Sequence, residues 1–503
     1  MSDLLTRGEY QAIADRLTFA ATGFVDGAFR AAKGGETFDS VNPATGRTLA
    51  TVAAYQAADI DFAVQKAREA FDDGRWRCKS PAERKETLIQ LAKLLHRNRH
   101  ELAVLESLDS GKPIRDCATV DVPETINTLK WHAEAIDKLY DQSAPVGEDA
   151  MAVIVREPIG VAACVLPWNF PLMMLAWKIG PALASGCSVI VKPAEQTSLS
   201  ALRVAELAME AGIPAGAFNV VPGDGAGAGE PLGRHPDVDM VSFTGSTETG
   251  RAFLRYSADS NLKKVVLECG GKNPALVLED AEDLDLVAEQ VANAAFWNMG
   301  QNCSATSRLI VHEKVKPALM DRLLARAREW RMGDPLDPAN HLGALVDRGH
   351  FDKVCGYLEI ARQEASVALG GNGSDGYVEP TILDEVPRDS RLAREEIFGP
   401  VLCVIPVKST DEAVQVANDS PYGLAACVFS ANGKQALRTA RAMRAGTVTV
   451  NCYGEGDSTT PFGGYKQSGF GGRDNGLHAH DQYTELKTIW VDLSDRAPTD
   501  AVE

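Results

Sequence analysis

Hydrophobic residues in the first part of the chain recur at helical spacing. This spacing covers residues 57–72 and 122–140, and it also follows Ser80-Pro81-Ala82-Glu83. The last stretch combines a capping serine, a proline and a glutamate three positions on, which together indicate a helix start. Residues 19–52 instead predict short strands joined by turns.

From residue 152 the pattern changes to nearly continuous apolar runs that alternate with helical stretches. Such runs are typical of strands buried on both faces of a parallel sheet. The expected strands cover residues 152–166, 188–191, 218–221, 238–243, 264–267, 275–278, 308–312, 401–407, 425–429 and 446–450. The expected helices between them cover residues 199–211, 291–297 and 315–330.

This alternation predicts an α/β protein with two doubly wound domains that meet near residues 268–271. A late strand over residues 483–493 would need an edge to pair with, and another subunit can offer one. With 503 residues the chain is too long for one core, which agrees with more than one domain.

Composition and charge exclude several classes of function. A net charge of −18 argues against a nucleic acid partner, because phosphate binding needs a basic face. No CxxC or HExxH spacing occurs, so we expect no metal site and no disulfide framework. No secretory signal and no long apolar stretch is visible either, so we expect a cytoplasmic protein without a membrane span.

Cys303 is the first candidate for chemistry. It lies in Gly300-Gln301-Asn302-Cys303-Ser304-Ala305, where small and polar neighbours would let a thiolate meet a small molecule. Most cysteines in a chain of this size are small core residues, and that interpretation stays open for Cys303 taken alone.

Two other residues qualify as partners of a thiolate. Asn169 lies in Pro167-Trp168-Asn169-Phe170-Pro171, where prolines and aromatic rings hold an amide that can donate to an oxyanion. Glu268 ends an apolar run close to two glycines and is a candidate general base. An exposed glutamate at a strand end is the plain alternative.

Glycine-rich turns after strands indicate a nucleotide site. The run 223–229 lacks the G-x-G-x-x-G spacing, whereas residues 243–250 follow a strand and open a helix whose free N–H groups attract phosphate. Lys192 and Glu195 lie at another strand end, where they would reach ribose hydroxyls. Ordinary strand-to-helix turns explain the glycines equally well, and a solvated loop explains Lys192 and Glu195.

Taken together, these motifs resemble the NAD(P)-dependent aldehyde dehydrogenase superfamily over essentially the whole chain. Cys269 departs from the pattern, because the family usually carries leucine or alanine there. The stretches that carry the resemblance are Pro167-Trp168-Asn169-Phe170-Pro171, Gly245-Ser246-Thr247-Glu248-Thr249-Gly250, Glu268-Cys269-Gly270-Gly271-Lys272, Gly300-Gln301-Asn302-Cys303, Glu396-Ile397-Phe398-Gly399-Pro400 and Pro461-Phe462-Gly463-Gly464-Tyr465-Lys466.

The resemblance implies oxidation of an aldehyde to a carboxylic acid with NAD. Cys303 would form a thiohemiacetal and then a thioester, Asn169 would donate to the oxyanion, and Glu268, supported by Lys178, would activate water. A carboxylate at Glu195 would disfavour the 2′-phosphate of NADP. The residues implied to bind the cofactor are Leu166, Trp168, Lys192, Glu195, Gly225, Gly229, Phe243, Gly245, Ser246, Thr249, Glu396 and Phe398.

The resemblance also implies how the chain is divided. Residues 1–140 and 155–269 would form the NAD-binding domain, and residues 270–480 the catalytic domain. Residues 141–154 and 481–503 would form a small β oligomerisation flap that joins subunits into a homotetramer or a dimer.

Within the superfamily the chain resembles the bacterial ω-aminoaldehyde group, which includes γ-glutamyl-γ-aminobutyraldehyde and guanidinobutyraldehyde dehydrogenases of polyamine and arginine catabolism. The likeness rests on residues 131–140 and 483–490 and on Gly456-Asp457. A cationic aldehyde needs carboxylates at the mouth of its tunnel, and the candidates are Asp121, Glu455 and Asp457.

Three other functions remain as alternatives. One is a general aliphatic or betaine-type aldehyde dehydrogenase. Another is a CoA-acylating semialdehyde dehydrogenase, against which the hydrolytic base Glu268 argues. The third is a catalytically idle scaffold with the same fold, which would be free to lose Cys303, Asn169 or Glu268, although all three are present.

Overall fold

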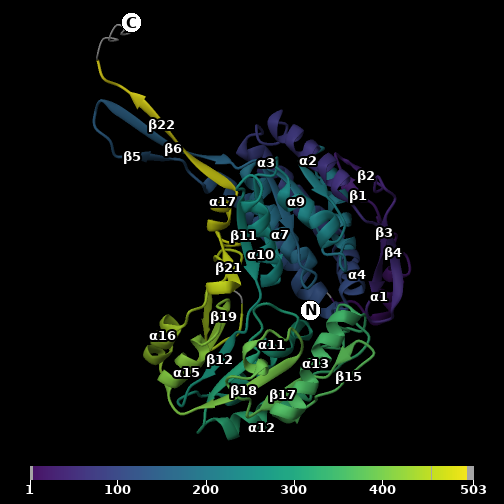
Figure 1. Cartoon of the computed structure of the whole chain (residues 1–503), viewed down its shortest axis with the longest axis vertical. Helices are drawn as coiled ribbons and strands as arrows, with labels where there is room; N and C mark the ends of the chain where they lie inside the picture. Colours follow the sequence, from purple (N-terminus) through teal and green to yellow (C-terminus); the bar gives the residue numbers. More distant parts are fainter. Residues whose placement is uncertain (1–3, 455, 496–503) are drawn as a thin grey trace.

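The computed structural model describes residues 4–454 and 456–495. Two lobes, each built on one large sheet, lie one above the other in Figure 1, and a narrow flap extends from the upper lobe. The α/β alternation expected from the apolar runs is therefore confirmed.

The sheet of the first lobe has the strand order β2-β1-β9-β8-β7-β10-β11-β21. Its central strands, β9 to β11 in that order, are parallel, whereas β1 and β21 run antiparallel to their neighbours. The strands are β1 (Gly23–Val25), β2 (Ala28–Arg30), β7 (Val161–Val165), β8 (Ser188–Lys192), β9 (Phe218–Val220), β10 (Met240–Gly245), β11 (Lys264–Cys269) and β21 (Gly469–Phe470).

Helices cover both faces of this sheet. Successive residues of each strand point to opposite faces, so they pack in two different buried clusters. In β7, Ala162 and Cys164 pack in one buried cluster and Val161 and Ala163 in the other. The first cluster is covered by α3 (Pro81–Arg97), α4 (Arg99–Ser110), α6 (Val122–Ala135), α7 (Pro171–Ser185) and α8 (Leu199–Glu210). The second is covered by α2 (Ala57–Asp72), α9 (Glu230–Arg234) and α10 (Thr247–Ala258).

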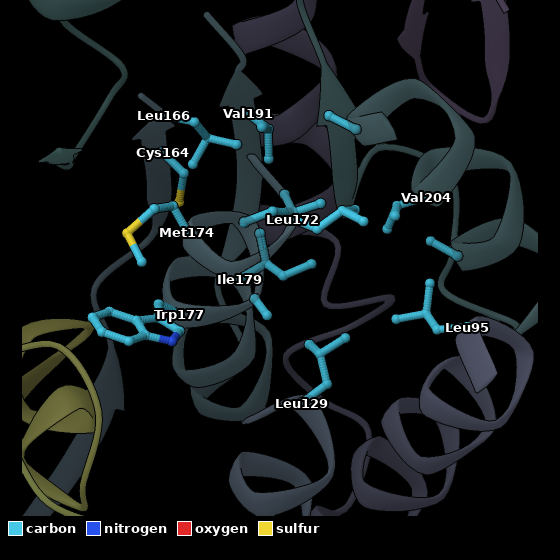
Figure 2. Packing of buried hydrophobic residues seen from close by; sticks show 14 of the residues in the cluster. Leu95, Leu129, Cys164, Leu166, Leu172, Met174, Trp177, Ile179, Val191 and Val204 are labelled. Atoms are coloured by element: carbon cyan, nitrogen blue, oxygen red, sulfur yellow. The ribbon is translucent and has the colours of Figure 1, made fainter. Parts of the chain in front are cut away.

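Helix α7 is the centre of the first cluster. Its residues from Pro171 to Ala184 are all buried, as expected for a helix that is apolar all round. Figure 2 shows side chains of α7, among them Leu172 and Ile179, between Leu129 of α6 and Val191 of β8. A helix packed on all sides holds the loop before it, which contains Asn169, in a fixed place.

The sheet of the second lobe has the order β14-β17-β18-β13-β12-β19-β20 and is parallel except for β14. Helices α11 (Leu284–Phe296), α12 (Lys316–Ala327) and α13 (Arg348–Glu364) cover one face, and α15 (Thr410–Asn418) and α16 (Gly433–Ala442) cover the other. The strands are β12 (Pro274–Val277), β13 (Arg308–His312), β14 (Ser366–Leu369), β17 (Thr381–Asp384), β18 (Val401–Val407), β19 (Ala425–Phe429) and β20 (Thr447–Val450).

Short elements connect and border these layers. They are α1 (Arg7–Ala14), β3 (Thr37–Asn42), β4 (Arg47–Ala53), α5 (Ile114–Asp116), the π turn η1 (Cys117–Asp121), η2 (Ile136–Lys138), η3 (Gly225–Gly229), η4 (Trp297–Gly300), β15 (Gly373–Ser374), β16 (Tyr377–Val378), α14 (Arg391–Arg394), η5 (Lys466–Ser468) and α17 (His478–Gln482).

The flap corrects one expected strand. The run 152–166 forms two strands in different sheets, because the chain turns at Gly160, which has a φ of +131°. Before this turn, β6 (Ala150–Pro158) pairs antiparallel with β5 (Gln142–Ala144) and with β22 (Thr484–Asp492). The late strand thus finds an edge in its own chain.

Most other boundaries differ from the expected ones by a few residues, but the helix expected over residues 291–297 is the end of α11, which begins at Leu284. The helix expected over residues 122–140 ends at Ala135 and continues as one 3-10 turn. After β20 the chain returns to the first lobe, where Gly469 of β21 pairs with Glu268 of β11. The proposed division into domains stays a prediction.

Candidate active site

The turn before Cys303 has an unusual backbone. Asn298, Met299 and Gly300 have φ values of 53°, 56° and 67°, so three consecutive residues are left-handed. A Cβ on Gly300 would lie 2.1 Å from the carbonyl oxygen of Gly399, so this position needs glycine. The turn ends α11 abruptly and directs Cys303 towards the first lobe.

Hydrogen bonds fix the cysteine loop on both sides of Cys303. The carbonyl of Cys303 accepts a bond of 2.7 Å from Asn273 Nδ2. Asn302 Nδ2 donates to the Tyr453 hydroxyl at 2.8 Å, and its Oδ1 accepts from the Ser304 N–H at 3.0 Å. The Cys303 side chain is only partly buried, so a small molecule can reach it.

Asn169 is held against the same loop. Its Nδ2 donates to the Gln301 carbonyl at 2.9 Å, and Asn298 Nδ2 donates to the carbonyls of Asn169 and Gln301 at 3.2 and 3.0 Å. An amide nitrogen carries two hydrogens, so one stays available for a ligand. Asn169 and Cys303 line one cavity of about 270 Å³, as the sequence motifs predicted.

Glu268 lies near this cavity but is not among the described residues that line it. Its Oε2 accepts from the Gly464 N–H at 3.2 Å, and its Oε1 is buried without a hydrogen-bond partner. Burial, and after it the Asp474 carboxylate, raises the pKa of Glu268 well above the usual value, while Lys178 and Arg473 oppose that rise. The group is therefore a proton acceptor of unusual basicity.

Lys178 belongs to a buried polar network behind Glu268. Its Nζ lies 3.0 Å from Ser242 Oγ and 3.3 Å from Asp474 Oδ2, and Asp474 Oδ1 accepts from Gln482 Nε2 at 3.1 Å. The sequence analysis missed Asp474, since it follows a glycine pair in a stretch without helical or strand pattern.

Several predicted cofactor residues face Cys303 across the cavity. Trp168, Gly245, Ser246, Glu396 and Phe398 all line it. Glu396 Oε1 accepts from the backbone N–H of Gly271 at 2.7 Å, and burial raises the pKa of its carboxyl. The Trp168 ring meets the Phe398 ring edge-on, with centroids 5.3 Å apart.

The turn from β10 into α10 has a ready phosphate-binding shape. Ser246 caps α10 by accepting from the Thr249 N–H at 3.1 Å. A Cβ on Gly245 would lie 2.5 Å from the Phe243 ring, so only glycine lets the backbone pass there. Gly245 and Ser246 line the cavity, so the start of α10, with its free N–H groups, lies next to it.

The remaining cofactor candidates gather at the ends of β8 and β9. The buried Lys192 Nζ lies 3.6 Å from Glu195 Oε2, and Gly229 of η3 packs on the Lys192 side chain. Gly225 opens the same η3 turn, and the Leu166 N–H donates to the Lys192 carbonyl at 2.9 Å. Paired Lys and Glu groups, a glycine turn and a helix start together fit a dinucleotide laid across the strand ends.

A second cavity, of about 310 Å³, lies on the other side of the cysteine loop. Trp177, Trp297 and Tyr453 line it, and Tyr453 is the residue that binds Asn302 next to Cys303. Two carboxylates, Glu124 and Asp457, complete its lining. The cavity thus combines aromatic rings with negative charge.

Of the three predicted substrate carboxylates, Asp457 lines this cavity, and its role in substrate binding stays a prediction. Glu455 lies outside the described residues. Glu124 was missed, although it lies in the predicted helix 122–140; burial, and to a smaller extent Asp457, raise the pKa of its carboxyl. The influence of Asp457 indicates that the two acids act on the same space.

The prediction for Asp121 was wrong. Its carboxylate is fully buried and pairs with Lys112 Nζ at 2.6 Å, so it cannot meet a substrate at the mouth. The Lys112 ammonium in turn lies 3.9 Å from the centre of the Phe170 ring, next to Asn169. The π turn η1 directs Asp121 into the core, where it supports the wall of the site.

Two further observations concern what the described residues lack. Within residues 4–454 and 456–495, no group of His, Cys, Asp and Glu side chains is arranged to hold a metal ion. No helix in the same ranges has the length and apolar character that crossing a membrane requires.

Comparison with known proteins gives extensive matches. A family model described as the aldehyde dehydrogenase family matches residues 29–489. The aminoacetaldehyde dehydrogenase of Pseudomonas aeruginosa is 66% identical over 496 residues, which are 98% of this chain and 100% of that protein.

Two solved structures are similarly close in fold. A γ-glutamyl-γ-aminobutyraldehyde dehydrogenase from Burkholderia cenocepacia has a TM-score of 0.95 at 51% identity, covering 97% of this chain and 100% of its own. An indole-3-acetaldehyde dehydrogenase from P. syringae, solved with NAD+ and IAA, has a TM-score of 0.96 at 49% identity, with coverages of 97% and 100%.

Proposed function

The chain belongs to the aldehyde dehydrogenase family and is an NAD-dependent oxidoreductase, and from this premise we propose that it oxidises ω-amino aldehydes to ω-amino acids. The observation that carries the proposal is the pair of carboxylates, Glu124 and Asp457, in the aromatic cavity beside the cysteine loop. A free ammonium would pair with these acids and pack on the aromatic rings.

In the proposed reaction, Cys303 is the nucleophile and Asn169 the oxyanion donor. The Cys303 thiolate forms a C–S bond to the aldehyde carbon, and the carbonyl electron pair moves to oxygen as an alkoxide. The free N–H of Asn169 Nδ2 and the backbone N–H of Cys303 stabilise this alkoxide. Bound NAD supplies the acceptor for the hydride, and a thioester remains on Cys303.

Glu268 is proposed to remove a proton from the water that cleaves the thioester. Water adds to the thioester carbon, the C–S bond breaks, the Cys303 thiolate leaves and the carboxylic acid is released. Glu268 Oε1, which has no hydrogen-bond partner among the described residues, is the atom proposed to accept that proton, while Oε2 is bonded to the Gly464 N–H. Asp474, which pairs with the Lys178 ammonium behind Glu268, is the carboxylate that can take up this proton.

The cofactor would lie across the first lobe. Lys192 and Glu195 would bind the adenosine ribose, the α10 start at Ser246 the pyrophosphate, and Glu396 the nicotinamide ribose. In this arrangement the first lobe is the NAD-binding domain and the second, which contains Cys303, the catalytic domain.

Relatives support the substrate class without deciding it. Aminoacetaldehyde and γ-glutamyl-γ-aminobutyraldehyde are named as substrates of two similar proteins. The indole-3-acetaldehyde enzyme, whose named substrate is uncharged, is just as similar in fold. Oxidation of uncharged aldehydes is therefore the second candidate, favoured by the aromatic lining of the cavity.

Substituting the two acids separates these candidates. Glu124→Gln and Asp457→Asn together are expected to lower kcat/KM for 4-aminobutyraldehyde by about 10- to 100-fold, because a charge-assisted bond contributes roughly 1.5–3 kcal/mol. The kcat/KM for uncharged butyraldehyde should change by less than about threefold. An exposed control, Glu282→Gln, should change neither value.

An equal loss on both aldehydes would contradict the cation site, and a wild-type preference for butyraldehyde would favour the second candidate. Neither result would affect the proposed role of Cys303.

We further propose that the flap joins subunits into a tetramer or a dimer in the cytoplasm. The edge strand β22 exposes Leu486, Ile489 and Trp490, which a second copy of the flap would bury. Sedimentation of the wild type and of a Trp490→Asp variant tests this, since the variant should dissociate into smaller species.

A further inference from the structure

A third cavity, of about 330 Å³, lies behind the substrate cavity. It is formed by α5, α11 and α12 and by the segment that follows α12. Trp330 and His341, whose ring centres are 5.6 Å apart, form an aromatic wall. The volume is within the range of small-molecule sites, and the reaction as described does not use this space.

Two charged side chains around this cavity, one positive and one negative, form no salt bridge among the described residues, although the positive one, Arg115, attracts the neighbouring Asp116 carboxylate. Arg326 and Glu329 neutralise each other at 3.2 Å. Asp116 accepts a hydrogen bond from the Trp297 side chain. Among the described residues, neither Arg115 nor Glu289 has an ion-pair partner, although both line the cavity. A ligand that carries one carboxylate and one ammonium is complementary to this pair.

Trp297 connects this cavity to the substrate cavity, because its side chain lines both. On the substrate side, its ring lies on Phe170, with centroids 5.3 Å apart, next to Asn169. The backbone supplies a second connection: Arg115 and Asp116 of α5 continue through the π turn η1 directly into α6, which carries Glu124. Such π turns are often found at functional sites.

We propose that this cavity binds a small ω-amino carboxylate, the chemical class of the reaction product, with its carboxylate on Arg115 and its ammonium on Glu289. The bound molecule presses on Trp297 and so lowers turnover without entering the substrate cavity. The choice of this class rests on the proposed function, whereas the existence of a zwitterion site rests on the cavity and its two charges without a salt bridge.

Calorimetric titration of the full-length protein with 4-aminobutyrate, in the presence of NAD, measures binding without turnover. We expect saturable binding that is at least about tenfold weaker for butyrate and for butylamine, which each lack one charge. Arg115→Gln and Glu289→Gln should each weaken the binding of 4-aminobutyrate about tenfold or more while leaving kcat/KM unchanged. Arg328→Gln, at an exposed arginine outside the cavity, is the matched control.

Steady-state kinetics complete the test. In the wild type, 4-aminobutyrate should inhibit non-competitively with respect to the aldehyde. The Arg115→Gln variant should lose this non-competitive inhibition. Equal affinity in wild type and both variants, or inhibition that is purely competitive in all of them, would overturn the proposal. The titration needs no aldehyde, so it tests the binding site independently of the substrate class. A wild-type preference for uncharged substrates would contradict the proposed substrate class, and the titration would still show whether 4-aminobutyrate binds in this cavity.

Discussion

The two cavities that meet at the cysteine loop are built in different ways. On the cofactor side, the polar groups are fixed by backbone: the Gly271 N–H holds Glu396, and Ser246 caps α10. On the proposed substrate side, Glu124 and Asp457 come from separate segments and line the cavity, and Asp457 Oδ1 accepts from the backbone N–H of Thr459 at 2.8 Å. If the proposed roles hold, the groups on the cofactor side serve every substrate, whereas the charge of the accepted aldehyde depends on Glu124 and Asp457 alone.

The largest expected effect comes from Glu268, whose substitution should lower turnover for every aldehyde. Glu268→Gln should lower steady-state turnover by about 10²- to 10⁴-fold for charged and uncharged aldehydes alike, because hydrolysis loses its general base. A first turnover of NADH should survive, since Cys303 is still acylated; Cys303→Ser should lose this burst as well. Rapid mixing with detection of NADH measures both.

Wild-type turnover should rise with pH until Glu268 is ionised, because a base with a raised pKa is protonated, and idle, at low pH. The Glu268→Gln variant should lack this rise. A Glu268→Gln variant with normal steady-state turnover would remove Glu268 from the mechanism.

A smaller effect is expected from a side chain on the cofactor side. Glu195→Gln should raise kcat/KM with NADP relative to NAD by about tenfold, since a carboxylate next to Lys192 would no longer repel the 2′-phosphate. Selectivity between 4-aminobutyraldehyde and butyraldehyde should stay constant. Equal kcat/KM values with NAD and NADP in the wild type would contradict the expected preference for NAD.

The last prediction concerns Glu106, which is buried behind the substrate cavity. Its substitution should change activity least and should clearly change the pH dependence of stability. Burial, followed by the Asp121 charge, raises the pKa of Glu106 from 4.5 to about 8. Its Oε1 accepts from the Leu172 N–H at 3.1 Å, at the start of α7. The folded protein therefore favours the protonated form, and its stability should fall as pH rises from about 4.5 to about 8.

Glu106→Gln keeps the hydrogen bond and removes the titration, so the urea midpoint of the variant should fall less than that of the wild type between pH 6 and pH 9. The exposed Glu86→Gln variant should behave like the wild type. Parallel curves for Glu106→Gln and wild type would show that Glu106 is ionised in the folded protein throughout.

The same contrast explains what the sequence could predict. Gly245 and Ser246 follow directly from a strand into a helix, so the local pattern alone places them at the end of β10. Glu396 precedes β18 in the other lobe, and only the family motif indicated that it would line the same cavity. Glu124 and Asp121 are three residues apart, yet one faces the cavity and the other Lys112. The π turn η1 shifts the helical phase just before Glu124, and a count at regular helical spacing cannot include that shift.

Asp474 and Tyr453 were unpredictable for another reason. Each lies in irregular chain and gains its role only through a distant partner, Lys178 for the first and Asn302 for the second. Such contacts depend on how the returning segment packs against the first lobe, and no local pattern encodes that.

The left-handed turn at Asn298, Met299 and Gly300 also has a consequence for folding. Left-handed backbone costs an L residue roughly 1–2 kcal/mol, so an isolated segment avoids the turn. One support comes from the other lobe, because Asn298 Nδ2 donates to the Asn169 carbonyl, and the close approach of the Gly399 carbonyl admits only glycine at position 300. We therefore expect that a partly synthesised or half-folded chain lacks this turn, and that Cys303, the proposed nucleophile, reaches its final position only once the two lobes have docked.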